Sequence, residues 1–215
     1  MARRSSPHDS TTQVVLQTID AYERSAADCL ARWSKRRLRS APLLTEWLNH
    51  LPVNARLLDL GCGGGQDADN FRQRGYRVVG LDRTNALLLA GRRRDPWLPL
   101  VLADLRQLPF QAMSFDGLWA AASLMHLPKT VARRVLIDLC SLVRPGGFLA
   151  ATVTYGVKSG IVTDGWVPGR YFARWNKEEL ARAVQRAGWE IISLRVVSNQ
   201  ERKGRWLNFL AQRLG

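Results

Sequence analysis

The sequence predicts an α/β fold built on a doubly wound, mostly parallel sheet. Short apolar stretches that read as strands alternate with segments of helical periodicity. One stretch, Arg56–Leu60, runs directly into a glycine-rich turn at 61–65, and a helical pattern follows at 67–74. Two further strands end on an acid, Asp82 and Asp104, so that acids recur at intervals of 23 and 22 residues from Asp59. This interval suits one strand-helix repeat.

The composition is that of a single globular domain. A chain of 215 residues with 46% hydrophobic residues can build one α/β core. No apolar run reaches membrane-spanning length, and the N-terminus lacks the apolar segment of a secretory signal. Three scattered cysteines, Cys29, Cys62 and Cys140, predict neither a disulfide framework nor a metal site. We therefore expect a reduced, cytoplasmic protein without a membrane partner or a metal.

The net charge of +14 leaves two interpretations open. A basic face would attract nucleic acid or an anionic membrane. However, the arginines are spread along the chain, and the two clusters at Arg32–Arg39 and Arg92–Arg94 are also typical of solvated helix faces.

The glycine-rich turn indicates a nucleotide cradle, because a strand that turns sharply into a helix needs glycine for positive φ and for close approach to a ligand. A dinucleotide fingerprint requires glycine at its first, third and sixth positions, but the sixth position here is Gln66. The pattern present is Asp-x-Gly-x-Gly-x-Gly, from Asp59, Gly61, Gly63 and Gly65.

This pattern resembles the first motif of class I S-adenosylmethionine-dependent methyltransferases, and the resemblance continues from about residue 55 to the C-terminus. It implies a Rossmann-like, doubly wound sheet of seven strands, mostly parallel with an antiparallel final strand, and helices on both faces. It also implies two units: an N-terminal helical cap of the active site at 1–54 and the methyltransferase domain at 55–215.

Asp82 and Asp104 are the candidate nucleoside contacts. An acceptor-only carboxylate at the tip of the second strand suits the two ribose hydroxyls, although Asp82 could instead only cap the helix expected at 84–93. Asp104, at the end of a strand at 98–102, resembles the family's adenine-contacting acid. The cofactor contacts that the resemblance implies are Asp59, Gly61, Cys62, Gly63, Asp67, Asp82, Arg83, Asp104, Leu105 and Ala121.

His126 is the candidate catalytic residue. It follows a strand at 114–122, and ligands in open α/β sheets bind beyond the carboxyl ends of strands. A histidine is common at this place in the family. As a neutral imidazole it could take a proton from the acceptor, or it could simply form the pocket wall.

Two segments are expected to cover the site. Helical spacing at 13–33 includes Tyr22, in a segment that resembles the Tyr-x-x-x-Ala helix of small-molecule methyltransferases, although core packing would also explain this tyrosine. Residues 155–175 have many aromatics and no clean period, which predicts an irregular, mobile substrate lid. The candidate substrate contacts are Tyr22, Tyr155, Arg170 and Tyr171.

The remaining pattern gives the other elements of the fold. A helix is expected at 43–50, another at 130–143, and a structural Arg144–Gly147 turn before a strand at 148–154. Asn176 and Glu179 predict the start of a helix that Gly188 ends. Two antiparallel strands at 189–197 and 205–212 complete the chain.

The function that follows is S-adenosylmethionine-dependent methyl transfer to an O, N or S nucleophile of a small-molecule acceptor. Three alternatives remain: an RNA (tRNA-type) methyltransferase using the basic surface, a nicotinamide oxidoreductase, which Gln66 disfavours, and a non-catalytic cofactor-binding subunit of a modification complex.

Overall fold

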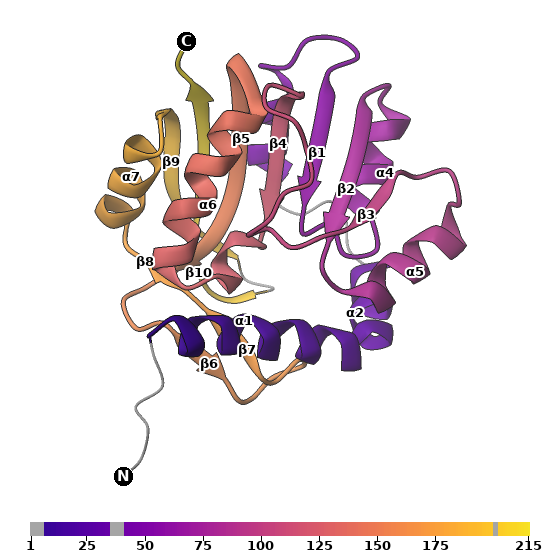
Figure 1. Ribbon diagram of the computed structural model, residues 1–215, viewed down its shortest axis with the longest axis vertical. Coiled ribbons are helices and arrows are strands. Elements are labelled where there is room, and N and C mark those ends of the chain that lie inside the picture. The colour runs from indigo at the N-terminus through magenta and orange to yellow at the C-terminus, as the bar shows by residue number, and fades with distance from the viewer. Residues whose placement is uncertain (1–6, 35–40, 200–201) are drawn as a thin grey trace.

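The fold is a central twisted sheet with helices on both faces (Figure 1). The computed structural model describes residues 7–34, 41–199 and 202–215. The main strands lie in the order β3-β2-β1-β4-β5-β10-β9. Their bounds are β1 (Arg56–Leu60), β2 (Arg77–Asp82), β3 (Leu100–Leu102), β4 (Phe115–Ala121), β5 (Val143–Tyr155), β9 (Trp189–Asn199) and β10 (Arg202–Arg213).

Strand direction confirms the predicted fold class. The first five strands of the sheet run parallel to one another, whereas β10 is antiparallel to both β5 and β9. One short strand was not predicted: β8 (Arg174–Trp175) pairs with the end of β5 and makes the sheet eight-stranded.

The helices follow the predicted alternation with the strands. They are α1 (Pro7–Arg24), α2 (Ala26–Ser34), α3 (Ala41–Leu48), α4 (Gln66–Gln73), α5 (Asn85–Arg94), α6 (Lys129–Leu142) and α7 (Lys177–Arg186), with a 3₁₀ turn η1 (Leu124–His126). No helix among the described residues is long and apolar enough to cross a membrane.

Both faces of the sheet are buried, and adjacent strand residues enter different cores because side chains alternate along a strand. Leu58 of β1 packs in the cluster that contains α6 and α7, whereas Leu57 packs in the cluster that contains Trp47 of α3 and Phe71 of α4. Trp47 is fully buried. Of the predicted cap at 1–54, α3 therefore belongs to a core of the sheet, while α1 and α2 form a smaller cluster with α5.

The single helix expected at 13–33 is two helices, because the chain turns at Ser25 between α1 and α2. The turn lets both helices bury small residues, Ala21 from α1 and Cys29 from α2, against Leu87 of α5. The apolar spacing predicted helical structure but contained no signal for this turn.

Strand β5 begins at Val143, five residues before the expected start at Phe148. The pair Phe115–Val143 is followed by the pair Gly117–Phe148, so residues 144–147 have no partner on β4 and the predicted turn lies within the strand as an unpaired bulge. This difference is a β-bulge, which local sequence signals read as a turn.

The segment at 155–175 is more regular than predicted. It contains a two-stranded antiparallel hairpin, β6 (Gly160–Val162) and β7 (Arg170–Phe172), as well as β8. The hairpin lies beside α1 (Figure 1), and the backbone N–H of Tyr171 donates to Thr18 Oγ1 at 2.9 Å. Each strand has only three residues, too few for a detectable alternation.

Candidate functional site

A cavity of about 120 Å³ lies at the carboxyl ends of the parallel strands, and α1 forms one of its walls. The strand order reverses here between β1 and β4, which is where open α/β sheets bind ligands. The lining residues are Val15, Thr18, Ile19, Tyr22, Trp33, Gly61, Gly63, Leu81, Asp82, Arg83, Thr84, Leu87, Asp104, Leu105, Ala121, Ala122, Ser123, His126 and Leu127.

The glycine turn needs its glycines. Gly61 and Gly63 have φ of 72° and 58°, in the left-handed region that favours glycine. The backbone N–H groups of Gly61 and Cys62 both donate to the carbonyl of Leu81, at 2.7 and 3.0 Å. A Cβ on Gly61 would lie only 2.4 Å from Cβ of Ser123. The turn is therefore held close to the ends of both β2 and β4.

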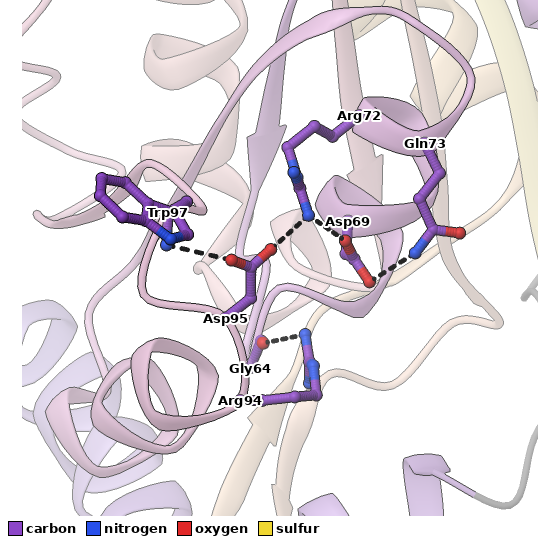
Figure 2. Close-up of polar contacts among 7 residues, drawn as sticks. All are labelled: Gly64, Asp69, Arg72, Gln73, Arg94, Asp95 and Trp97. Atoms are coloured by element: carbon purple, nitrogen blue, oxygen red, sulfur yellow. Dashed lines mark hydrogen bonds and ion pairs between the residues drawn. The ribbon is translucent and has the colours of Figure 1, made fainter.

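Two arginines of the Arg92–Arg94 cluster support this region from α5. Arg94 donates to the carbonyl of Gly64 at 2.9 Å (Figure 2), and Arg92 donates to the carbonyl of Leu100 at 2.7 Å. These two arginine side chains are therefore engaged with the protein's own backbone.

A chain of polar contacts continues from α5 to α4. Arg72 lies between Asp69 and Asp95 and contacts both, while Gln73 donates to Asp69 at 3.0 Å and the backbone N–H of Trp97 donates to Asp95 at 3.0 Å (Figure 2). These contacts join the two helices that flank the turn.

Asp82 lines the cavity at the end of β2 and organises the loops around it. One carboxylate oxygen accepts the backbone N–H of Gly63 at 2.8 Å, and the other accepts that of Thr84 at 2.7 Å. Burial raises the pKa of Asp82 and outweighs these hydrogen bonds. Because each oxygen has two lone pairs, the group can accept further bonds from a ligand. Asp82 and its neighbour Arg83 line the cavity.

Asp104 lines the cavity with Leu105, but its carboxylate is already engaged. Arg106 donates from Nε and Nη2 at 3.0 and 2.8 Å, and its backbone N–H donates at 2.9 Å. Burial alone would raise the pKa of Asp104, but the hydrogen bonds and charge of Arg106 lower it overall. The position of Arg106, two residues after Asp104, lets its side chain reach back to the carboxylate.

Three of the predicted cofactor residues do not line the cavity. Asp59 is buried within β1, and Cys62 is buried in the turn, where burial raises the pKa of its thiol. Asp67 accepts a hydrogen bond from the indole of Trp119 at 2.9 Å, which fixes the start of α4 against β4.

The end of β4 contributes residues that the sequence did not single out. Ala121 lines the cavity as predicted, and Ala122 follows with φ of 64°, which is uncommon for a residue other than glycine. Ser123 is buried and lines the cavity, and its Oγ has no hydrogen-bond partner among the described residues. Buried hydroxyls are normally hydrogen-bonded, so this group points to a ligand contact.

His126 is held by contacts on both ring nitrogens. Nδ1 lies 2.8 Å from the carbonyl oxygen of Tyr171, and Nε2 lies 3.0 Å from Oη of Tyr22. A carbonyl only accepts, so Nδ1 carries the hydrogen; in the neutral ring Nε2 is then the acceptor and Tyr22 is the donor. Burial lowers the pKa of His126 to about 4, while the Tyr171 carbonyl opposes this shift and the charge of Arg170 adds to it.

Arg170 joins the same network. It is 8% exposed, and its Nη1 donates to Tyr22 Oη at 3.2 Å while Nε donates to the carbonyl of Val167 at 2.8 Å. Its guanidinium carbon lies 5.0 to 5.4 Å from the ring centroids of Tyr22, Trp166 and Phe172. Within the described part of the chain, Arg170 forms no ion pair.

Of the four predicted substrate residues only Tyr22 lines the cavity; Arg170, Tyr155 and Tyr171 do not. Tyr171 contributes through its backbone, to Thr18 and to His126. Tyr155 lies at the end of β5, where the guanidinium of Arg205 stacks over its ring at 4.2 Å. A position at the carboxyl end of β5 does not by itself place the Tyr155 side chain in the cavity, because side chains alternate in direction along a strand.

The residues present fit an adenosyl nucleoside. Gly61 and Gly63 of the glycine turn line the cavity, as do two acidic side chains and Ser123, whose buried hydroxyl has no hydrogen-bond partner among the described residues. Among the described residues no group of three or more His, Cys, Asp or Glu side chains could hold a metal ion.

Comparison with known proteins defines the class. The family described as "Methyltransferase domain" matches residues 58–151. A demethylmenaquinone methyltransferase of Corynebacterium kroppenstedtii is 30% identical over 164 residues, which cover 65% of this chain and 70% of that protein. The ubiquinone biosynthesis O-methyltransferase of a Methylobacterium species is 30% identical over 169 residues, covering 70% of this chain and 66% of that protein. The chain therefore belongs to the class I S-adenosylmethionine-dependent methyltransferases.

Other matches are shorter. The malonyl-[acyl-carrier protein] O-methyltransferase of Salmonella typhimurium is 35% identical over 98 residues, and this chain spans only 38% of its length. Among solved structures, the Burkholderia thailandensis 1,6-didemethyltoxoflavin-N1-methyltransferase, with bound 1,6-didemethyltoxoflavin and S-adenosylhomocysteine, has the same fold. The two structures superpose with a TM-score of 0.77 at 21% sequence identity, and the match covers 100% of this chain and 93% of that one.

Proposed function

We propose that this chain transfers the methyl group of S-adenosylmethionine to an O, N or S atom of a small-molecule acceptor. The observation that carries the proposal is the single cavity that gathers the glycine turn, Asp82, Asp104 and His126 from four separate segments. The relatives named for quinone and acyl-carrier-protein methylation support a small acceptor.

On the cofactor side, the chain supplies shape and hydrogen-bond acceptors. Gly61 and Gly63 let the backbone approach the ligand, Asp82 accepts from the ribose hydroxyls, and Asp104 with Leu105 contacts the adenine. When bound, S-adenosylmethionine supplies an already reactive methyl group, so the protein's task is mainly alignment.

On the acceptor side, His126 and Tyr22 lie at the wall of the cavity, with Arg170 behind Tyr22. Because the pKa of His126 is lowered to about 4, its ring is neutral at neutral pH and can accept a proton. The same low pKa makes the isolated ring a weak base, so His126 needs help from its neighbours.

Calorimetric titration tests the cofactor assignment. S-adenosylmethionine and S-adenosylhomocysteine should bind, and NAD should not. Asp82→Asn should weaken binding, whereas Asp138→Asn on α6, outside the cavity, should not. Binding of NAD without a response to either adenosyl compound would contradict the proposal.

A screen with methyl-tritiated cofactor against cell-extract fractions then tests the acceptor class, and RNase-treated fractions test the RNA alternative. That alternative rests on the charge of +14. Two arginines of its Arg92–Arg94 cluster bind backbone carbonyls, and most of the Arg32–Arg39 cluster lies outside the described residues. Labelling that disappears with RNase would overturn the small-molecule assignment.

A further inference from the structure

Resting on the proposed function, we infer that Tyr22 is a catalytic residue that receives the acceptor's proton, with His126 behind it and Arg170 as the positioning cation. The inference names a substrate class: an acceptor whose methylated atom carries an acidic hydrogen, as in a phenol, an enol or a ring N–H. The three groups come from α1, η1 and β7. Tyr22 and His126 line the cavity, whereas Arg170 does not line it and donates to Tyr22 Oη.

The direction of the hydrogen bonds gives Tyr22 this role. Because the Tyr171 carbonyl fixes the hydrogen on Nδ1 of His126, Tyr22 must donate to Nε2. His126 Nε2 is thus covered by the phenol. A hydroxyl has one hydrogen and two lone pairs, so Tyr22 Oη can accept from Arg170 and from a ligand while it donates to His126.

Proton transfer from the acceptor through Tyr22 to His126 needs no further reactant. The acceptor's O–H or N–H bond breaks as a new bond forms between that proton and Tyr22 Oη. Tyr22's own proton moves to His126 Nε2, and the imidazolium later releases it to solvent. The deprotonated acceptor atom takes the methyl group that the bound cofactor supplies, and S-adenosylhomocysteine leaves.

Arg170 favours the ionised acceptor. Burying an unpaired charge is costly, and this guanidinium is 8% exposed with two hydrogen bonds, three aromatic neighbours and no ion pair within the described ranges. The acids that line the cavity are Asp82 and Asp104, and the structure gives neither an ion pair with Arg170. A negative charge that develops beside Tyr22 would therefore be stabilised by an otherwise uncompensated cation.

The test uses 4-nitrophenol as a probe, because only its anion absorbs visible light. The probe is added to protein that is saturated with S-adenosylhomocysteine. Titration of the probe's absorbance against pH gives its ionisation constant when bound. We expect this constant to rise at least about tenfold over its value in water, which corresponds to roughly 1.4 kcal/mol. Tyr22→Phe and Arg170→Gln should each lose the increase, and Arg170→Lys should restore part of it.

Matched controls separate this role from a structural one. Tyr76→Phe, in the opposite core, and Arg174→Gln, on β8, should keep the increase in the probe's ionisation. Circular dichroism checks that each variant is folded, and if Arg170→Gln is not, Arg170→Lys and Tyr22→Phe still decide the result.

Three results would overturn the inference: no binding of the probe, binding with an unchanged ionisation constant, or an increase that survives in folded Tyr22→Phe. A loss of S-adenosylhomocysteine affinity above about tenfold in Arg170→Gln, with the probe's ionisation unchanged, would assign Arg170 to the cofactor's carboxylate instead. Failure of the wild type to bind S-adenosylhomocysteine at all would contradict the proposed function, and this is measured separately.

Discussion

Tyr22 and His126 are 104 residues apart in the sequence, yet Oη of the first lies 3.0 Å from Nε2 of the second. Their rings meet edge to face, with centroids 5.4 Å apart. The contact joins the N-terminal helix α1 to the 3₁₀ turn η1 that follows β4, while the Tyr171 carbonyl fixes the tautomer of the imidazole and burial keeps it neutral. Folding, protonation and the geometry of the cavity are therefore coupled at this pair.

Stability should fall with acid because of His126. The folded-state pKa is about 4 and the ordinary value is 6.5, so the unfolded chain binds more protons between these values. The contribution of neutral His126 to the free energy of unfolding is complete above its unfolded-state pKa of 6.5 and is lost as the pH falls toward 4. Between pH 7 and pH 5 the wild type should lose about 2 kcal/mol from this residue.

Urea unfolding at the two pH values measures this loss. His126→Asn should show a smaller difference in the free energy of unfolding between them, while His50→Asn, at an exposed position, should behave as the wild type. An equal acid loss in His126→Asn would show that groups other than His126 dominate the response between pH 7 and pH 5.

Asp82→Ala should weaken binding of S-adenosylhomocysteine about tenfold to a hundredfold, because lost hydrogen bonds to a charged group cost roughly 1.5–3 kcal/mol. The carboxylate also holds the backbone of Gly63 and Thr84, so part of the loss reflects a looser turn. Calorimetry on Asp82→Ala and Asp82→Asn measures it, since Asn keeps one acceptor. Unchanged affinity in both folded variants would leave Asp82 as a structural residue only.

Gly61→Ala should abolish cofactor binding and destabilise the fold. Its Cβ would lie 2.4 Å from that of Ser123, and φ of 72° is unfavourable for alanine. We expect a loss of about 1–3 kcal/mol in the free energy of unfolding. Gly160→Ala, where nothing lies within 4 Å of the added Cβ, is the matched control. Thermal unfolding and titration on both variants check this, and wild-type affinity in Gly61→Ala would contradict it.

Local signals predicted much of the fold and part of the site. The strand at Arg77–Asp82 has its predicted bounds. Asp82, the last residue of β2, and Asp104, two residues after the end of β3, both line the cavity because the position of each is set by the strand before it. Asn176 accepts from the backbone N–H of Glu179 at 2.8 Å, as the capping pattern predicted.

What the sequence did not predict depends on contacts between distant segments. The Tyr22–His126–Arg170 network joins three elements, and Arg170 was proposed only as a substrate contact of a lid. The bulge that lets β5 start at Val143 depends on pairing with β4, and periodicity within one segment does not contain it. Asp67, which was predicted to contact the cofactor, does not line the cavity and accepts a hydrogen bond from Trp119, 52 residues further along the chain.

The last prediction concerns the lid at 155–175, which we expect to be mobile without substrate and to order over the cavity. Both of its ends are held: the N–H of Gly156 donates to the carbonyl of Trp175 at 2.9 Å, and that of Ala173 donates to the carbonyl of Met125 at 2.7 Å. Residues 160–162 and 169–172 are also paired in the β6–β7 hairpin. Fast hydrogen exchange should therefore be confined to residues 157–159, where Val157 is 81% exposed, and to the hairpin tip at 163–168. Exchange measured by mass spectrometry, without and with S-adenosylhomocysteine plus an acceptor fraction from the tritium screen, should show protection of this stretch on closure.

Equally slow exchange at the tip and at Ala173 in the free protein would show a fixed wall. Protection that never appears in the ternary complex would remove the segment from substrate selection.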